Sequence, residues 1–334
     1  MKKTTGQHSL FSVPQQEKII GHEAIRHFFD RAVKSDRLAH AFLFVGPEHV
    51  GKMTIARDFA TTLLGTETLE KHPDFFLVER ERDAKTGKLH GTIVLEQINA
   101  LCSKLALGAF LRGWKVCVLD GADCLTTESA NALLKTLEEP HPKTLLILLA
   151  SSFEQVLPTI RSRCQLMRFT RVSTNRIKDA LVERGTALEQ AKLWSRLSGG
   201  NPGRALMFFE NPEMLNEMFD WRNILFSFTD SAIADRWSGL ESILPKKLSF
   251  QESVDRATQV LDLLVELLRD AMMLGQGRED QIVHVDSRTS LDAWLGNLGL
   301  QKIMMVLEEV KTARRFLDAN VNPRSVLDYV AACF

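Results

Sequence analysis

The chain has 334 residues and a formal net charge of zero, and this length suits two or three domains with cores of their own. Free-standing nucleic-acid binders usually carry a basic excess, so we expect any work near nucleic acid to go through partners. The five scattered cysteines form no C-x-x-C pair, which favours reduced thiols in a cytoplasmic protein over a disulfide framework or a zinc site. The first 16 residues lack the apolar stretch of a signal peptide, and no apolar run reaches membrane-spanning length.

Short apolar runs alternate with helical patterns in the first half of the chain, which predicts an α/β base domain over residues 1–170 with a parallel sheet. The five runs that predict strands are AFLFV (41–45), DFFLV (74–78), KVCVLD (115–120), LLILLA (145–150) and QLMRF (165–169). One helix is expected after Lys52. Another is expected in TTESANALLKTLEEP, capped by Thr126 or Thr127 and ended by Pro140.

Helical patterns alone follow Phe169. Residues 173–183 and 187–197 predict two short helices, and Asn201-Pro202 predicts the start of a third, so 171–210 is expected to be a small helical lid. Residues 211–334 are expected to form an all-helical third domain, in which apolar residues after Phe250 recur every three or four positions. Charge-rich loops are predicted at Arg82–Gly91 and Gly275–Ser287.

The segment GPEHVGKMT, residues 46–54, nearly matches a phosphate-binding loop. Gly46, Gly51 and Lys52 are in place, between a predicted strand and a predicted helix whose N-terminus favours anions. The hydroxyl that would bind Mg²⁺ is replaced by Met53, and Thr54 is rotated about 100° away on the helix. Glu48 also brings negative charge to the loop.

The strand KVCVLD ends in Asp120, as the second motif of a nucleotide site requires. Hydrolysing enzymes commonly carry Glu at the next position, where it orients the attacking water. Gly121 stands there and cannot polarise water. Asp123 is interpreted as a polar residue of the strand-to-helix turn rather than a substitute for that Glu.

Several longer segments resemble AAA+ clamp-loader subunits of bacterial DNA polymerase III, and the closest resemblance is to the delta-prime branch of that family. The segments are IIGHEAIRHFF, RLAHAFLFVGPEHVGK, LDGADCLTTESANALLKTLEEP, LLILLASSFEQVLPTIRSRC and LSGGNPGRAL; near the C-terminus, ANVNPRSVLDYV is similar to the last helix of the bacterial collar domain. The resemblance implies a P-loop base, a helical lid and a helical collar that joins subunits.

The resemblance also implies roles for individual residues. Those that match a nucleotide site are the adenine-pocket residues Ile19, Ile20, Gly21 and His22, the loop residues Gly46, Gly51 and Lys52, the acid Asp120, the γ-phosphate sensor Ser151 and the lid arginine Arg204. Arg163, in Ser162-Arg163-Cys164, matches the arginine finger that enters a neighbouring subunit's ATP site.

Met53 and Gly121 fit a family member with a degenerate site, so the expected protein does not hydrolyse ATP itself and binds it weakly or not at all. The zinc module of many relatives is missing from LLGTETLEKHPDFF, so no metal site is expected. The implied partners are gamma/tau-like ATPase subunits and a delta-like subunit in a hetero-oligomeric ring. Through that ring the chain would help to load a sliding clamp on primed DNA during replication.

The sequence is compatible with other roles for these residues. Arg163 could be a structural or DNA-facing arginine, and Arg204 could simply hold the lid on the base. Arg161 would point away from Arg163 if the segment is extended. At the level of function, the rivals are an active AAA+ ATPase, as a catalytic loader subunit or a recombination-associated relative, and a nucleotide-dependent adaptor with no role at a neighbour's site.

Overall fold

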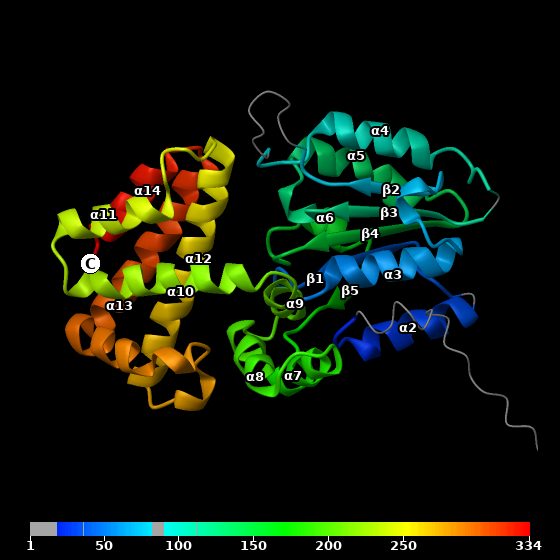
Figure 1. Ribbon diagram of the computed structural model, residues 1–334. Helices are drawn as coiled ribbons and strands as arrows, with labels where there is room; N and C mark the ends of the chain where they lie inside the picture. The colour runs from blue at the N-terminus through cyan, green and yellow to red at the C-terminus, as the bar shows by residue number, and fades with distance from the viewer. Residues whose placement is uncertain (1–18, 36, 82–89, 112) are drawn as a thin grey trace, which may run out of the picture. The chain divides into compact units, whose positions relative to one another are not determined.

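A computed structural model describes residues 19–35, 37–81, 90–111 and 113–334, and the chain divides into two compact units (Figure 1). The first unit holds the described residues up to Leu206, and the second begins at Met207. The predicted base and lid are not separated by this division, so the three domain boundaries stay predictions. The loop predicted at Arg82–Gly91 lies mostly outside the described residues, and residues 1–16 lie wholly outside them.

The first unit contains a five-stranded parallel sheet in the order β2-β3-β4-β1-β5. All five predicted strands are confirmed, with boundaries shifted by at most one residue: β1 (Ala41–Val45), β2 (Phe75–Val78), β3 (Lys115–Asp120), β4 (Thr144–Ala150) and β5 (Gln165–Arg168). In the central strands β1 and β4 every residue is buried, which explains why they read as continuous apolar runs.

Helices cover both faces of the sheet (Figure 1). Alternate residues of the central strands enter two separate cores, one on each face. Phe42 and Phe44 pack with α2 (Glu23–Lys34) and α3 (Lys52–Leu64). Leu43 and Val45 pack with α4 (Leu95–Leu105) and α5 (Thr127–Glu138). Thr126 caps α5 by accepting a hydrogen bond from Ser129 N, as the sequence predicted. The sheet is therefore held rigidly between two helical layers.

Short helices complete the first unit. They are α6 (Pro158–Arg161), which precedes β5, and α7 (Thr174–Glu183), α8 (Leu188–Leu197) and the start of α9 (Pro202–Glu210). Single 3₁₀ turns occur at Leu69–Lys71 and Ala122–Cys124. The predicted helices of the lid segment are confirmed to within a residue.

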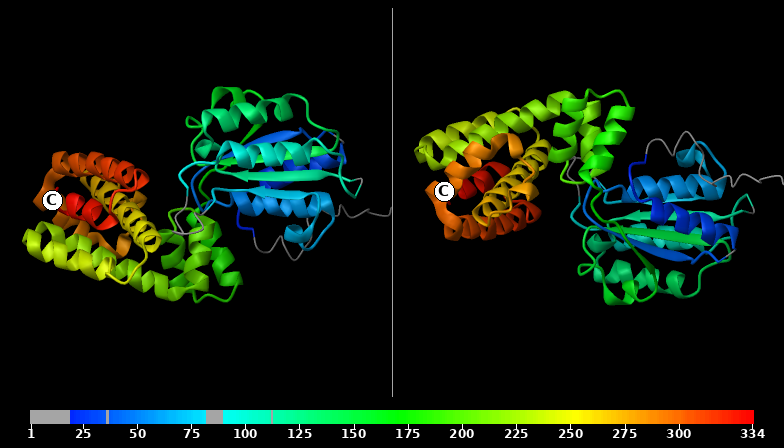
Figure 2. Two further views of the ribbon diagram at one scale, coloured as in Figure 1. Left: turned by 90° about the horizontal axis from the view of Figure 1, so that it is seen from above. Right: turned by 90° about the horizontal axis from the view of Figure 1, so that it is seen from below.

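The second unit is helical, as expected, and α12 lies beside α13 in it (Figure 2). Its helices are α10 (Pro212–Phe226), α11 (Ile233–Ile243), α12 (Phe250–Gly275), α13 (Arg288–Asp318) and α14 (Pro323–Ala331). Gly299, at φ 68° and ψ 161°, interrupts α13. The loop predicted at Gly275–Ser287 contains two 3₁₀ turns, and its backbone is held by the buried Asp270 carboxylate, which accepts from Val283 N and His284 N.

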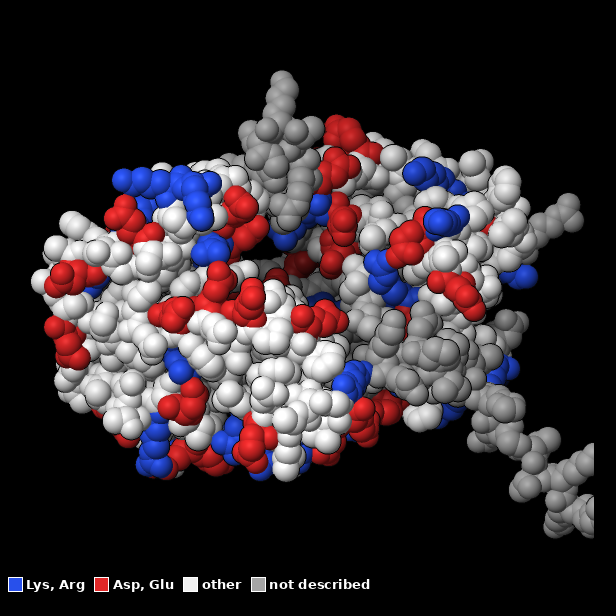
Figure 3. Space-filling model, in the orientation of Figure 1, with Lys and Arg blue, Asp and Glu red and all other residues white. Residues whose placement is uncertain are grey.

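Basic and acidic side chains are interspersed over the face drawn in Figure 3, in keeping with the zero net charge. Within the described part of the chain, no helix combines the length and the apolar character that crossing a membrane would need.

Asn322 begins α14, where its side chain accepts a 2.9 Å hydrogen bond from Arg324 N and Pro323 occupies the first helical position. We predict that Asn322→Ala lowers the free energy of unfolding by about 1 kcal/mol, because an N–H of the first turn loses its partner. Asn322→Asp keeps the acceptor and should stay close to wild type. Chemical denaturation measures both, and equal losses in the two variants would contradict the capping role.

Asp58 of α3 is only 4% exposed, and neither carboxylate oxygen has a hydrogen-bond partner among the described residues. Burial raises the pKa of Asp58 to about 6, and Arg26 of α2 offsets part of the rise. A raised pKa means that the folded state holds this proton more tightly than the unfolded state. The stability contributed by protonated Asp58 is therefore fully present below about pH 4 and is lost as the pH rises through about 6.

We predict that wild type loses stability relative to Asp58→Asn between pH 4 and 6. Each pKa unit is worth about 1.4 kcal/mol, so the relative loss is at most about 3 kcal/mol. Denaturation curves at several pH values give the difference profile. Asp179→Asn, at an exposed position of α7, controls for the general effect of removing a carboxylate. Parallel profiles for wild type and Asp58→Asn would contradict the prediction.

Candidate functional site

The predicted nucleotide-site residues of the base gather at the carboxyl edge of the sheet. Gly46 follows β1, Asp120 ends β3 and Ser151 follows β4. These three strands are parallel and adjacent in the order β3-β4-β1, so their carboxyl ends meet at one edge. Open α/β sheets commonly bind ligands at this edge.

Two glycines shape the phosphate loop. A Cβ on Gly46 would lie 2.4 Å from the carbonyl oxygen of Phe169, so only glycine lets β1 leave the sheet beside that backbone. Gly51 precedes α3 with a φ of 111°, a conformation that L side chains rarely adopt. The backbone of this fold therefore requires glycine at both positions, whether or not the loop binds a phosphate.

Lys52 opens α3 and turns its ammonium back onto its own loop. Its Nζ donates to the carbonyl oxygens of Gly46 at 2.5 Å and Pro47 at 2.8 Å. Burial lowers the pKa of Lys52, and the charges of Asp120 and Glu48 oppose that shift. Burial likewise raises the pKa of Asp120, opposed by the nearby Lys52. The two groups that would face a phosphate and its metal are thus electrostatically coupled.

Neither of the two substituted positions offers catalytic chemistry. Met53 packs against the core formed with α2 and α3, and Thr54 is exposed on α3. Gly121 has a φ of 102° at the end of β3. A glutamate at position 121 would be strained in that conformation.

The segment that matches an adenine pocket lies directly against the phosphate loop. Ile20 is buried, and Gly21 has a φ of 81° with Val172 side-chain atoms 2.7 Å from where its Cβ would be. The Nε2 atom of His22 lies 2.8 Å from the Val50 carbonyl oxygen, within hydrogen-bonding distance. The Ile20–His22 segment, which would form one wall of the candidate pocket, therefore contacts the phosphate loop.

The lid helices are also bonded to the base within the first unit. Gly203 N, in the first turn of α9, donates to the His49 carbonyl oxygen at 2.8 Å. Arg176 of α7 pairs with both carboxylate oxygens of Glu23 on α2, at 2.8 and 2.6 Å. Arg204, the predicted lid arginine, follows Gly203 in α9, which places it beside the residue that contacts the loop.

Asp123 organises the turn after β4. Its Oδ2 accepts hydrogen bonds from Ser151 N at 2.8 Å and Ser152 N at 3.4 Å. This geometry supports the interpretation of Asp123 as a turn residue. It also means that the backbone of Ser151, the predicted sensor, is positioned by Asp123.

Arg163 lies at the opposite edge of the sheet from the phosphate loop, because it precedes β5, which runs parallel to β1 from its Phe42 end. Its guanidinium is bonded to Glu138, the last residue of α5, and to the Thr159 carbonyl oxygen. The length of β1, roughly 16 Å at 3.3 Å per residue, separates the two edges.

The expectation for Arg161 needs a correction. Residues 158–161 form the helical turn α6 instead of an extended segment, so strand alternation does not separate Arg161 from Arg163. The Arg161 guanidinium lies 4.6 Å from the centre of the Phe153 ring, a cation–π contact, whereas Arg163 contacts Glu138. The two arginines nevertheless have different partners.

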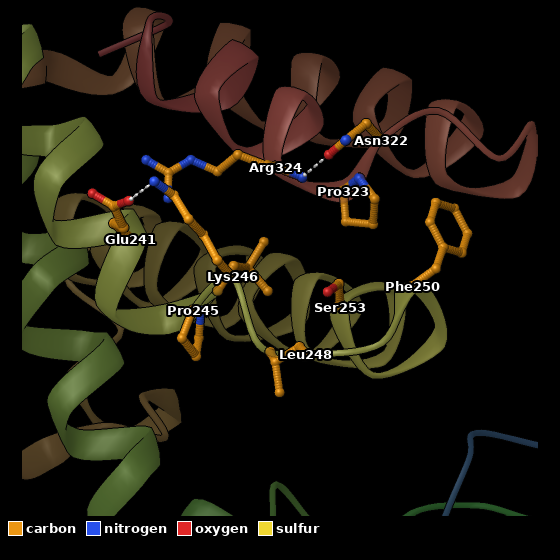
Figure 4. A pocket seen from close by; sticks show the side chains of 10 residues that line it. Glu241, Pro245, Lys246, Leu248, Phe250, Ser253, Asn322, Pro323 and Arg324 are labelled. Carbon is orange, nitrogen blue, oxygen red and sulfur yellow. Dashed lines mark hydrogen bonds and ion pairs between the residues drawn. The ribbon is translucent and has the colours of Figure 1, made fainter.

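The structure adds two residues that the sequence did not single out, Glu138 and Gly203. Both lie in segments quoted for their resemblance, but their contacts join residues far apart in the chain, so no local pattern points to them. The second unit adds a surface hollow of about 450 Å³ beside the start of α14 (Figure 4). Its edge carries a Lys246–Glu241 ion pair at 3.6 Å.

Two family models match the chain. One, described as DNA polymerase III, delta subunit, matches residues 21–173, and the other, described as its C-terminal part, matches residues 243–327. The matched ranges include the phosphate loop, Arg163 and most of α14, and together they cover more than half of the chain.

Curated relatives carry the name of the delta' subunit. DNA polymerase III subunit delta' of Bacillus subtilis is 25% identical over 90% of this chain and 92% of its own length. The subunit delta' of Escherichia coli K12 is 28% identical over 72% of this chain and 66% of its own length.

A solved structure supports the fold. A DNA polymerase III gamma subunit-related protein of Thermotoga maritima superposes with a TM-score of 0.54 at 13% identity, over 93% of this chain and 97% of that one. The predicted fold class, an α/β AAA+ base with a parallel sheet followed by helices, is confirmed. The chain belongs to the delta-prime family of bacterial DNA polymerase III clamp-loader subunits.

Proposed function

We propose that this clamp-loader subunit hydrolyses no ATP itself and supplies Arg163 to the ATP site of a neighbouring subunit. The observation that carries the proposal is the location of Arg163 at the amino edge of the sheet, a strand's length from the chain's own phosphate loop. From there it cannot reach a phosphate held by Gly51 and Lys52. A guanidinium keeps its charge and its fork of donors at any working pH, so it suits a phosphate presented by another chain.

Met53 and Gly121 support the absence of hydrolysis. The first leaves no hydroxyl for Mg²⁺, and the second leaves no carboxylate to orient water. Gly121 also has a positive φ, a backbone conformation that would strain a glutamate at this position. Lys52 and the loop glycines leave room for weak ATP binding, which the carbonyl oxygens of Gly46 and Pro47 oppose by occupying the Lys52 ammonium. No zinc is required in this proposal.

Similarity to other clamp-loader subunits supports the proposed partners. DNA polymerase III subunit tau of Bacillus subtilis is 29% identical over 49% of this chain, and the gamma/tau subunit of Mycoplasma genitalium is 28% identical over a similar share. In our proposal gamma/tau-like ATPases and a delta-like subunit form a hetero-oligomeric ring with this chain. The helical second unit serves as the collar of that ring, which places a sliding clamp on primed DNA.

We predict that the isolated chain shows no ATP turnover above background, and that Lys52→Ala leaves this result unchanged. The reason is the joint loss of the metal-binding hydroxyl and of the water-orienting carboxylate. Phosphate release by the purified chain measures it, with a gamma/tau-like subunit as the positive control. Turnover that Lys52→Ala abolishes would overturn the proposal of a non-hydrolysing subunit.

We predict that Arg163→Ala preserves folding and assembly but lowers ATP hydrolysis at the neighbouring site by roughly 10³-fold, since an arginine finger offsets charge on the transferring phosphoryl group. The total ATP hydrolysis rate of the reconstituted complex, which is what is measured, falls by the contribution of that one site. Arg161→Ala, two residues away, is the matched control and should leave the rate unchanged. Equal rates for Arg163→Ala and wild-type complexes would refute the finger assignment.

A further inference from the structure

The guanidinium of Arg163 is almost fully used by its own chain. Its Nε donates to Glu138 Oε1 at 2.8 Å, and its Nη2 bonds to the same oxygen. Its Nη1 lies 3.1 Å from the Thr159 carbonyl oxygen and 3.1 Å from Ser162 Oγ. An arginine has five N–H donors, so these four contacts leave one for any other acceptor. A phosphate can be bound by the usual two-pronged fork only if one of these contacts breaks.

Glu138 is placed to attract a cation. It is the last residue of α5, where the unpaired carbonyl groups of a helix carry partial negative charge. The side chains of Arg163 and Glu138 are 34% and 50% exposed, so the pair is solvated. Exposed ion pairs are weak: the paired state is favoured over the separated state by a factor of up to about five. The contact is therefore reversible.

We propose that Glu138 is a latch for Arg163: it holds and neutralises the finger on its own subunit until a neighbour's ATP phosphate displaces it. This inference rests on the proposed function of Arg163 and adds a positioning residue to it. A triphosphate carries more negative charge than one carboxylate and accepts two parallel N–H bonds from the fork, so it competes effectively. While Glu138 holds Arg163, the guanidinium cannot bind the neighbour's phosphate. The latch therefore lowers the fraction of time that Arg163 spends at the neighbouring ATP site.

The latch predicts a gain of activity. In the reconstituted complex at saturating ATP, Glu138→Gln should raise the ATPase rate by up to about fivefold, the factor by which an exposed ion pair is held. The change is expected in kcat, because the finger acts on the transferring phosphoryl group. Glu139→Gln is the matched control: it removes the same charge from the next residue and leaves the Arg163–Glu138 pair intact.

The same measurement in an Arg163→Ala background separates the latch from the finger. Glu138→Gln should have no effect there, because no finger remains to be released. An unchanged or lowered rate for Glu138→Gln, in complexes where Arg163→Ala does lower the rate, would overturn the latch alone. A rise of equal size in the Arg163→Ala background would overturn it too. If Arg163→Ala has no effect, the proposed function fails first.

Discussion

The parallel pairing of β1 with β4 and β5 is the constraint on which the functional arrangement depends. Together with the parallel pairing of β3 and β4, it brings the residues after β1, β3 and β4 to one edge of the sheet, which creates the candidate nucleotide site. The same pairing sends Arg163, which precedes β5, to the other edge. The same strand pairing therefore brings the candidate nucleotide-site residues together and places Arg163 away from them.

The phosphate loop also makes contacts that hold parts of the first unit together without a nucleotide. Gly46 lets the chain pass the Phe169 backbone, and the His49 carbonyl oxygen accepts the hydrogen bond from Gly203 at the start of α9. His22 also contacts the loop, through the Val50 carbonyl oxygen. The loop therefore joins the base, the α2 entry and the lid through contacts that do not involve a nucleotide.

The two arginines of the Arg161–Arg163 segment have partners of different kinds. Arg161 stacks on Phe153 and contributes to local packing. Arg163 is held by one exposed carboxylate and by a backbone carbonyl, and water competes with both contacts. A cation kept in place by weak, exposed bonds can change partners at little cost in free energy, which a buried ion pair could not do.

The sequence by itself determined the five strands, the helices after Lys52, after Thr126 and in residues 173–210, the near-complete phosphate loop and the substitutions Met53 and Gly121, because periodicity and motifs are local properties of the chain. The helical turn α6 before Arg163 was not among these elements. It also determined Arg163 as a candidate through its segment's resemblance. Only the tertiary structure decided that Lys52 bonds its own loop, that Gly121 has a positive φ, and that Arg163 pairs with Glu138 twenty-five positions away. Those contacts depend on strand order and helix packing, which bring distant residues together.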